Sequence, residues 1–156
     1  MYHKTISSSD DVAKITSNIV TEQNIEKNKI VQEPKEQHLS FKENQKGITY
    51  DSLFGAYLKG ATKITITDPY IRIFFQAKNL MELIETIINN KTVEDIVNLH
   101  LITIADDKAP ENQLNFFEQI QLSAQIAGVV FTWEFDTTET IHARSIVTNT
   151  GWKISL

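Results

Sequence analysis

The chain has 156 residues, a length typical of one domain, and 41% of its residues are hydrophobic, which suffices for a buried core. It contains no cysteine, which excludes disulfides and thiolate chemistry, and no apolar run approaches the ~20 residues that span a bilayer. The formal net charge of -5 comes entirely from residues 47–156, so summed positive charge does not favour binding to DNA or anionic membranes. Any phosphate recognition must therefore come from a local site.

The first 46 residues are predicted to be a mostly disordered tail or linker. They are rich in Ser, Asn, Gln, Lys and Glu, and their apolar residues are scattered. A helical period at Val12, Ile15 and Ile19 is too sparse to bury much surface, so at most one frayed helix is expected. The N-terminus lacks the apolar segment of a secretory signal, and the chain is expected to be cytoplasmic.

Residues 47–156 have the periodicities of a single α/β domain. Strands are predicted at residues 63–67, 97–104, 129–135, 143–148 and 152–156. Helices are predicted from 53 to 59 after an N-cap at Asp51 and Ser52, from 73 to the polar stretch 89–91, and from Pro110 to the glycine at 128. The apolar stripe of the last helix, which includes Leu114 and Phe117, is expected to face the core.

This order of elements predicts a mixed, mainly parallel sheet with helices packed on it. Strands separated by helices of this length pair in parallel through right-handed crossovers. The last two strands flank residues 149–151, a turn signal typical of a β-hairpin, which adds an antiparallel edge.

Three residues directly follow the first predicted strand, at the edge where parallel sheets bind ligands. They are Asp68, Tyr70 and Arg72, and Arg72 is a candidate contact for an anion. The alternative is structural: a turn in which Asp68 caps the next helix, Tyr70 packs, and Arg72 pairs with a carboxylate such as that of Asp68.

The segment from residue 141 to 149 combines His142, Arg144 and Asn149 at a defined spacing. Side chains alternate along a strand, so His142 and Arg144 are predicted to point to the same face, and Asn149 is expected to fold back beside them from the turn. Together with Arg72, His142 and Arg144 predict an anion site; the alternative is a hairpin histidine and a solvated arginine. His142 has no second His or Cys nearby, so no metal site is predicted, and no cofactor is expected.

Five blocks of the domain resemble the phospholipase D-like C-terminal domain of the MIT-domain-containing protein family. In order, they are residues 53–61, 68–72, 100–101, 141–144 and 149–154. The segments YDSLFGAYLKGA, NLMELIETI and FTWEFD are also similar to the version of this module at the C-terminus of bacterial Lon-like AAA+ proteins, including those of BREX phage-defence systems. The resemblance implies a phospholipase D-like fold for residues 47–156. It also implies truncation at the C-terminus, because the family domain continues beyond the Trp-Lys-Ile strand.

Phospholipase D-like enzymes use a His-x-Lys-x4-Asp motif, in which the His attacks a phosphodiester and the Lys holds the phosphate. The resemblance assigns these positions to His142, Arg144 and Asn149. Arginine keeps the charge and can bind phosphate through two N–H groups, whereas asparagine removes a negative charge whose loss costs orders of magnitude in other triads. An active enzyme also needs two motifs and this chain has one, so the module is predicted to be non-catalytic. Without a Walker A motif or a Lon-type Ser/Lys site, the chain holds neither ATPase nor protease.

The resemblance implies acidic-phospholipid binding and dimerisation, as in the eukaryotic relatives, while the bacterial context implies DNA or phage defence. We therefore expect a homodimeric module that binds a partner protein or a phosphate-bearing ligand, either nucleic acid or an acidic phospholipid headgroup. Two alternatives stay open. One is a dimeric phosphodiesterase or nuclease that pairs His142 from two chains, and the other is a regulatory tail of a defence ATPase without a ligand.

Overall fold

The computed structural model describes residues 33–42 and 44–156. The predicted tail lies mostly outside the described residues, and so does its expected frayed helix. The chain divides into two compact units, residues 1–35 and 36–156, and the second contains all the helices and strands described below. Within this second unit, Gln37 Nε2 donates a hydrogen bond of 2.6 Å to the Tyr57 hydroxyl, so the segment before residue 47 contacts the domain.

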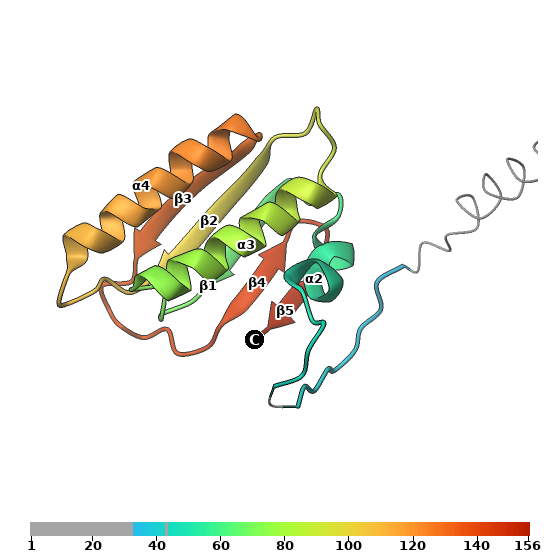
Figure 1. Cartoon of the computed structure of the whole chain (residues 1–156), viewed down its shortest axis with the longest axis horizontal. Coiled ribbons are helices and arrows are strands. Elements are labelled where there is room, and N and C mark those ends of the chain that lie inside the picture. Colours follow the sequence, from blue (N-terminus) through green and yellow to red (C-terminus); the bar gives the residue numbers. More distant parts are fainter. Residues whose placement is uncertain (1–32, 43) are drawn as a thin grey trace, which may run out of the picture. The chain divides into compact units, whose positions relative to one another are not determined.

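A five-stranded mixed sheet forms the centre of the domain (Figure 1). The strand order is β3-β2-β1-β4-β5; β1 pairs in parallel with β2, and β2 with β3, whereas β4 is antiparallel to β1 and β5 to β4. The bounds are β1 Lys63–Thr67, β2 Val97–Thr103, β3 Val129–Phe135, β4 Ser145–Thr148 and β5 Lys153–Ser155. The predicted mixed α/β fold with a mainly parallel sheet and a C-terminal hairpin is therefore confirmed.

Three described helices pack on one face of this sheet: α2 (Tyr50–Leu58), α3 (Phe74–Asn90) and α4 (Pro110–Ile126). Right-handed crossovers bring α3 and α4 to the same side, and Figure 1 shows both running along the strands, with α2 beside α3. Helix α2 begins earlier than predicted because Thr49 is its N-cap. Thr49 Oγ1 accepts a hydrogen bond from Ser52 N, and Ser52 Oγ accepts one from Thr49 N, both at 3.0 Å, which forms a capping box.

The hydrophobic core lies between the sheet and helices α3 and α4. Phe117 of α4 and Phe131 of β3 are fully buried, and their rings meet edge to face with centroids 6.0 Å apart. Burying a side chain of this size contributes roughly 1.5–3 kcal/mol. One predicted core position is wrong: Leu114 is 37% exposed, while its neighbour Gln113 is 1% exposed. The inward-facing position belongs to Gln113 because its carboxamide satisfies backbone groups at the ends of two strands.

The opposite face of the sheet carries no described helix. His100 and Thr132 point to this side and hydrogen-bond each other, with 2.8 Å between Nδ1 and Oγ1. Val130 and Val147 lie on the same face and are 41% and 42% exposed. Parallel sheets usually have both faces covered, so this surface is unusual for strands β1 to β3. None of the described helices is both long and apolar enough to cross a bilayer.

Candidate functional site

Asp68 and Arg144 form the centre of the candidate site, at the carboxyl end of β1. The antiparallel register pairs Thr67 with Ser145, which brings the residue after β1 next to the residue before β4. Arg144 Nε donates a hydrogen bond of 2.9 Å to Asp68 Oδ2, while Asp68 Oδ1 accepts one of 2.9 Å from Tyr70 N. Asp68 is buried, with 5% exposure, so a buried carboxylate fixes the Nε side of the more exposed guanidinium. The structural alternative in which Asp68 pairs with Arg72 is therefore wrong.

The Arg144 guanidinium has N–H donors that no described residue uses. Only Nε is used by Asp68, and neither Nη group contacts an acceptor among the described residues. The side chain is 45% exposed, whereas that of its partner Asp68 is 7% exposed. Because an arginine fork can donate two parallel N–H groups to phosphate, a guanidinium held by its Nε is well oriented for an anion.

Arg72 lies on the same short loop that anchors Arg144. Arg72 Nε donates to the Pro69 carbonyl at 3.3 Å, and neither Nη group has a hydrogen-bond partner among the described residues. Gln76 Oε1 accepts from Arg72 N at 3.0 Å and from Ile73 N at 2.9 Å, and this pair of hydrogen bonds fixes the start of α3. Tyr70 is 52% exposed, so its ring does not pack in the core.

His142 is exposed and lies outside β4, in a loop rather than on the predicted strand. It makes no hydrogen bond or ion pair with any residue that the structure describes. The loop itself is held by Asp136, whose carboxylate accepts from the backbone N–H groups of Thr138, Thr140 and Ile141 at 3.0, 2.9 and 3.2 Å. Hydrogen bonding, most strongly from the Thr138 hydroxyl, lowers the pKa of Asp136 to about 2.

Asn149 lies at the other end of β4, and the expectation that it folds back beside His142 and Arg144 is wrong. Its Oδ1 accepts from the N–H groups of Thr62 and Lys63 at 3.0 and 3.1 Å, and its Nδ2 donates to Thr62 Oγ1 at 2.9 Å. At ~3.3 Å per residue, a strand separates residues 144 and 149 by roughly 16 Å. Asn149 therefore joins the hairpin turn to the start of β1 and lies away from the other residues of the predicted anion site.

Gln113 positions the loops around the site and was missed by sequence reasoning. Its Nε2 donates to the carbonyls of Ile71 and Ile104 at 2.7 and 3.0 Å, and its Oε1 accepts from Asp106 N at 2.8 Å. A single side chain thus ties the segment after β1 to the segment after β2. The sequence pattern did not distinguish this glutamine from a solvated one, because the neighbouring Leu114 was expected to face the core. Asp136 did have a signal, because Asp followed by two Thr residues is typical of a side-chain-stabilised turn.

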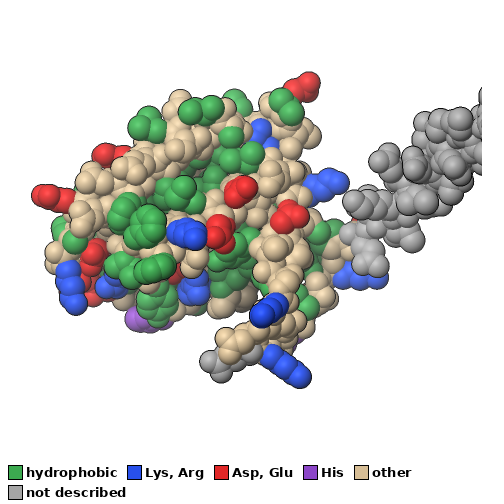
Figure 2. Space-filling view, in the orientation of Figure 1, with side chains coloured by type: hydrophobic (Ala, Val, Ile, Leu, Met, Phe, Trp, Pro, Cys, Tyr) green, Lys and Arg blue, Asp and Glu red, His purple; other side chains and the backbone are tan. Residues whose placement is uncertain are grey.

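Exposed apolar side chains surround the start of α3, directly after Arg72. Ile73, Phe74 and Phe75 are 52%, 59% and 72% exposed, and the ring of Phe74 packs on Phe116 with centroids 5.9 Å apart. Figure 2 shows hydrophobic side chains gathered at this end of the domain, with Lys or Arg side chains beside them. Ile73, predicted as the first residue of this helix, is its N-cap, and the helix begins at Phe74.

Comparison with known proteins identifies this fold. Residues 47–156 match the family described as a phospholipase D-like domain at the C-terminus of MIT. The chain is also similar to MIT domain-containing protein 1 of Mus musculus, with 32% identity over 120 residues. That alignment covers 76% of this chain and 47% of the mouse protein, so the chain spans about half the length of this relative.

Proposed function

Because the chain belongs to the family of phospholipase D-like domains found at the C-terminus of MIT proteins, we propose that it is a non-catalytic module that binds a phosphate-bearing ligand. The observation that carries the proposal is the guanidinium of Arg144, oriented by the buried carboxylate of Asp68 with its Nη groups free for an anion. Arg72, on the loop that contains Asp68, supplies a second guanidinium, and His142 is the third candidate contact.

A non-catalytic role is supported by the surroundings of His142. A nucleophilic histidine needs a second group that orients its ring, and no described residue hydrogen-bonds to this one. Asn149 is roughly 16 Å from Arg144 along the strand, at the end of β4 opposite to His142, and binds Thr62 and Lys63 instead. A dimeric phosphodiesterase that pairs His142 from two chains is the alternative, and its signature would be metal-independent turnover lost in His142→Ala.

The apolar surface beside Arg72 favours a phospholipid headgroup over nucleic acid. The net charge of -5 disfavours nucleic acid and anionic membranes alike, so the choice between them depends on the exposed apolar residues. Ile73, Phe74 and Phe75 are exposed next to a cationic side chain, which is the combination that inserts into the interfacial region of a membrane. The proposed ligand is therefore an acidic headgroup whose phosphate contacts Arg144 and Arg72.

We also propose that the module is a cytoplasmic homodimer, with its uncovered sheet face or the short edge strand β5 at the interface. Val130 and Val147 are exposed on that face, and Leu156, which follows β5, is 50% exposed.

The sequence similarity to the C-terminus of bacterial Lon-like AAA+ proteins leads us to propose the same origin, in a phage-defence setting, for this domain. A reading frame that encodes a Walker A ATPase upstream of Met1 would support that origin, and an unrelated upstream gene would contradict it.

Phosphate binding can be tested by NMR titration with inorganic phosphate, a soluble inositol phosphate and a short oligonucleotide. Arg144→Ala alone leaves the buried Asp68 carboxylate unpaired, so the informative variant is Asp68→Asn with Arg144→Ala, compared with Asp68→Asn alone. A charge-assisted contact is worth roughly 1.5–3 kcal/mol, so loss of Arg144 should weaken binding about ten- to a hundredfold. Arg144→Lys should keep part of the affinity. Unchanged binding in the double variant would contradict the proposal.

A further inference from the structure

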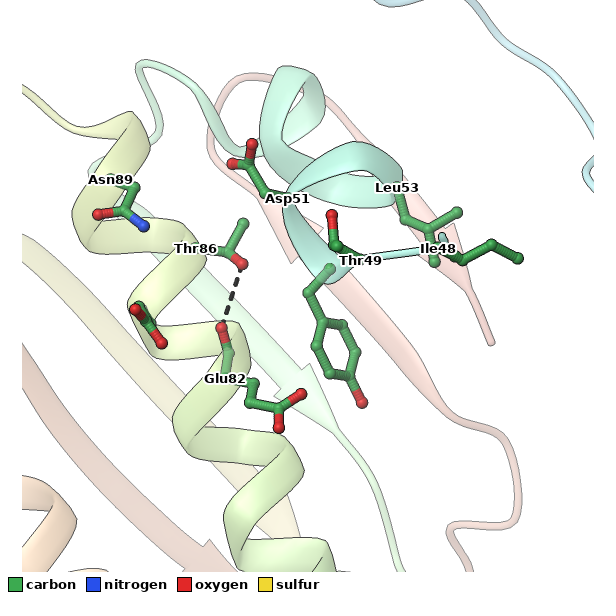
Figure 3. A pocket seen from close by; sticks show the side chains of 9 residues that line it. Ile48, Thr49, Asp51, Leu53, Glu82, Thr86 and Asn89 are labelled. Atoms are coloured by element: carbon green, nitrogen blue, oxygen red, sulfur yellow. Dashed lines mark hydrogen bonds between the residues drawn. The ribbon is translucent and has the colours of Figure 1, made fainter. Parts of the chain in front are cut away.

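A groove between α2 and α3 has a charge opposite to that of the anion site (Figure 3). Its volume is about 680 Å³. Ile48, Tyr50 and Leu53 supply apolar surface on the α2 side, and Glu82 and Glu85 line the α3 side. The Tyr50 ring stacks on Phe54 with centroids 5.7 Å apart, which fixes this wall. The groove is therefore a preformed apolar trough with carboxylates along it.

The carboxylates that line this groove form no ion pair with a lysine or arginine among the described residues. Asp51 Oδ1 accepts a hydrogen bond of 2.6 Å from Asn90 Nδ2, which joins α2 to α3 at one end of the trough. Glu82 and Glu85 are exposed, and their side chains have neither an ion-pair nor a hydrogen-bond partner in the described part of the chain. No lysine or arginine lines the groove. Carboxylates of this kind repel phosphate and acidic lipid and attract cations.

We propose that the groove docks a basic segment of a partner protein, in which an apolar residue lies between two lysines or arginines. From Glu82 to Asn89 the helix rises about 10 Å, which equals about three residues of extended chain. Side chains alternate along an extended segment, so the apolar residue can face Ile48 and Leu53 while its two neighbours reach the carboxylates of the rim. The Tyr50 side chain lies within electrostatic reach of Glu82, Arg144 and Asp68, so the groove is next to the Arg144 site, but docking of the segment does not depend on phosphate binding.

The test is fluorescence anisotropy with a labelled peptide of three lysines alternating with two leucines. Exposed ion pairs contribute roughly 0.2–1 kcal/mol each, so Glu82→Gln with Glu85→Gln should weaken binding about two- to thirtyfold. The matched control is Glu94→Gln with Glu118→Gln, which changes the net charge equally at exposed residues outside the groove. The affinity of the parent should also fall as salt rises, because the Debye length shortens.

The apolar contact and the location have their own readouts. Leu53→Ala should weaken binding, whereas Leu122→Ala, at a 66% exposed position of α4, should not. The Asp68→Asn, Arg144→Ala variant should bind the peptide normally, which separates this proposal from the anion site. Equal weakening by the control pair, equal binding of a Glu-Leu peptide, or peptide-induced amide shifts away from residues 48–53 and 82–89 would each overturn the proposal.

Discussion

The substitution Gln113→Leu tests whether one buried carboxamide holds together the segments that follow β1 and β2. Leucine has a similar volume but leaves two carbonyls, of Ile71 and Ile104, and the Asp106 N–H without their partner. A buried polar group that loses its partner costs about 1–3 kcal/mol. At the lower part of that range the three groups cost about 3–6 kcal/mol, and burial of the leucine offsets roughly 1–2 kcal/mol. We therefore expect a loss of about 2–4 kcal/mol in the free energy of unfolding.

Urea denaturation followed by far-UV circular dichroism measures this loss, with the m-value as a check that the unfolded state is unchanged. The matched control is Gln121→Leu, which removes a single half-buried hydrogen bond of 2.9 Å to the Phe131 carbonyl and should cost about 0.5–1.5 kcal/mol. Gln113→Leu should also shift amide resonances on the segments after β1 and β2, because both lose an anchor. A Gln113→Leu protein as stable as the control, with unshifted resonances near Arg72, would refute the reasoning.

Three further predictions concern the site and its loop. Asn149→Asp should leave stability nearly unchanged, because a carboxylate still accepts from Thr62 N and Lys63 N. It should also create no phosphodiesterase activity, and turnover of a phosphodiester reporter by this variant would contradict the placement of residue 149 at the end of β4 opposite to His142. Because the pKa of Asp136 is lowered in the folded state from 3.8 to about 2, the hydrogen bonds it accepts should persist above pH 4 and be lost as the pH falls towards 2. Amide exchange at Thr138 and Thr140 measures this loss, and Asp136→Asn should remove the acid dependence; the same dependence in that variant would disprove the assignment. Asp68→Asn should free the Arg144 side chain, seen as increased Nε exchange with solvent, and unchanged exchange would mean that the ion pair does not form in solution.

The strands and helices could be predicted because their signals are local. Strands β1 and β3 have the predicted bounds. Their apolar residues alternate within a few positions, and the residue that ends β1, Asp68, and the residue that precedes β3, Gly128, are adjacent in sequence to the strands. The start of α2 was misplaced for a related reason. Thr49, Asp51 and Ser52 are all acceptable caps, and only the reciprocal Thr49–Ser52 hydrogen bonds distinguish them.

The site could be predicted only in part, because its geometry depends on strand register. The sequence identified Asp68, Arg72 and Arg144, and the structure brings the first and third into contact. The sequence alone could not exclude Asn149 from the site. The position of this residue depends on whether the chain after Thr148 turns back towards Arg144 or continues to the start of β1. Gln113 was inaccessible for the same reason: its three partners come from segments that meet only when β1, β2 and α4 are packed.

The pairing of Arg144 with a buried aspartate limits how strongly the proposed anion site can bind. The Asp68 charge offsets that of Arg144, so attraction to phosphate depends on the direct contacts of the two guanidinium groups rather than on local net charge. Two contacts of roughly 1.5–3 kcal/mol each correspond to dissociation constants from several millimolar down to about tens of micromolar. The cost of association weakens binding further. Linking two such sites increases the apparent affinity by about 10²–10⁴ when both bind one surface. The weak, oriented site thus supports the proposed homodimer, since a dimer facing many headgroups binds where a monomer facing one phosphate would largely dissociate.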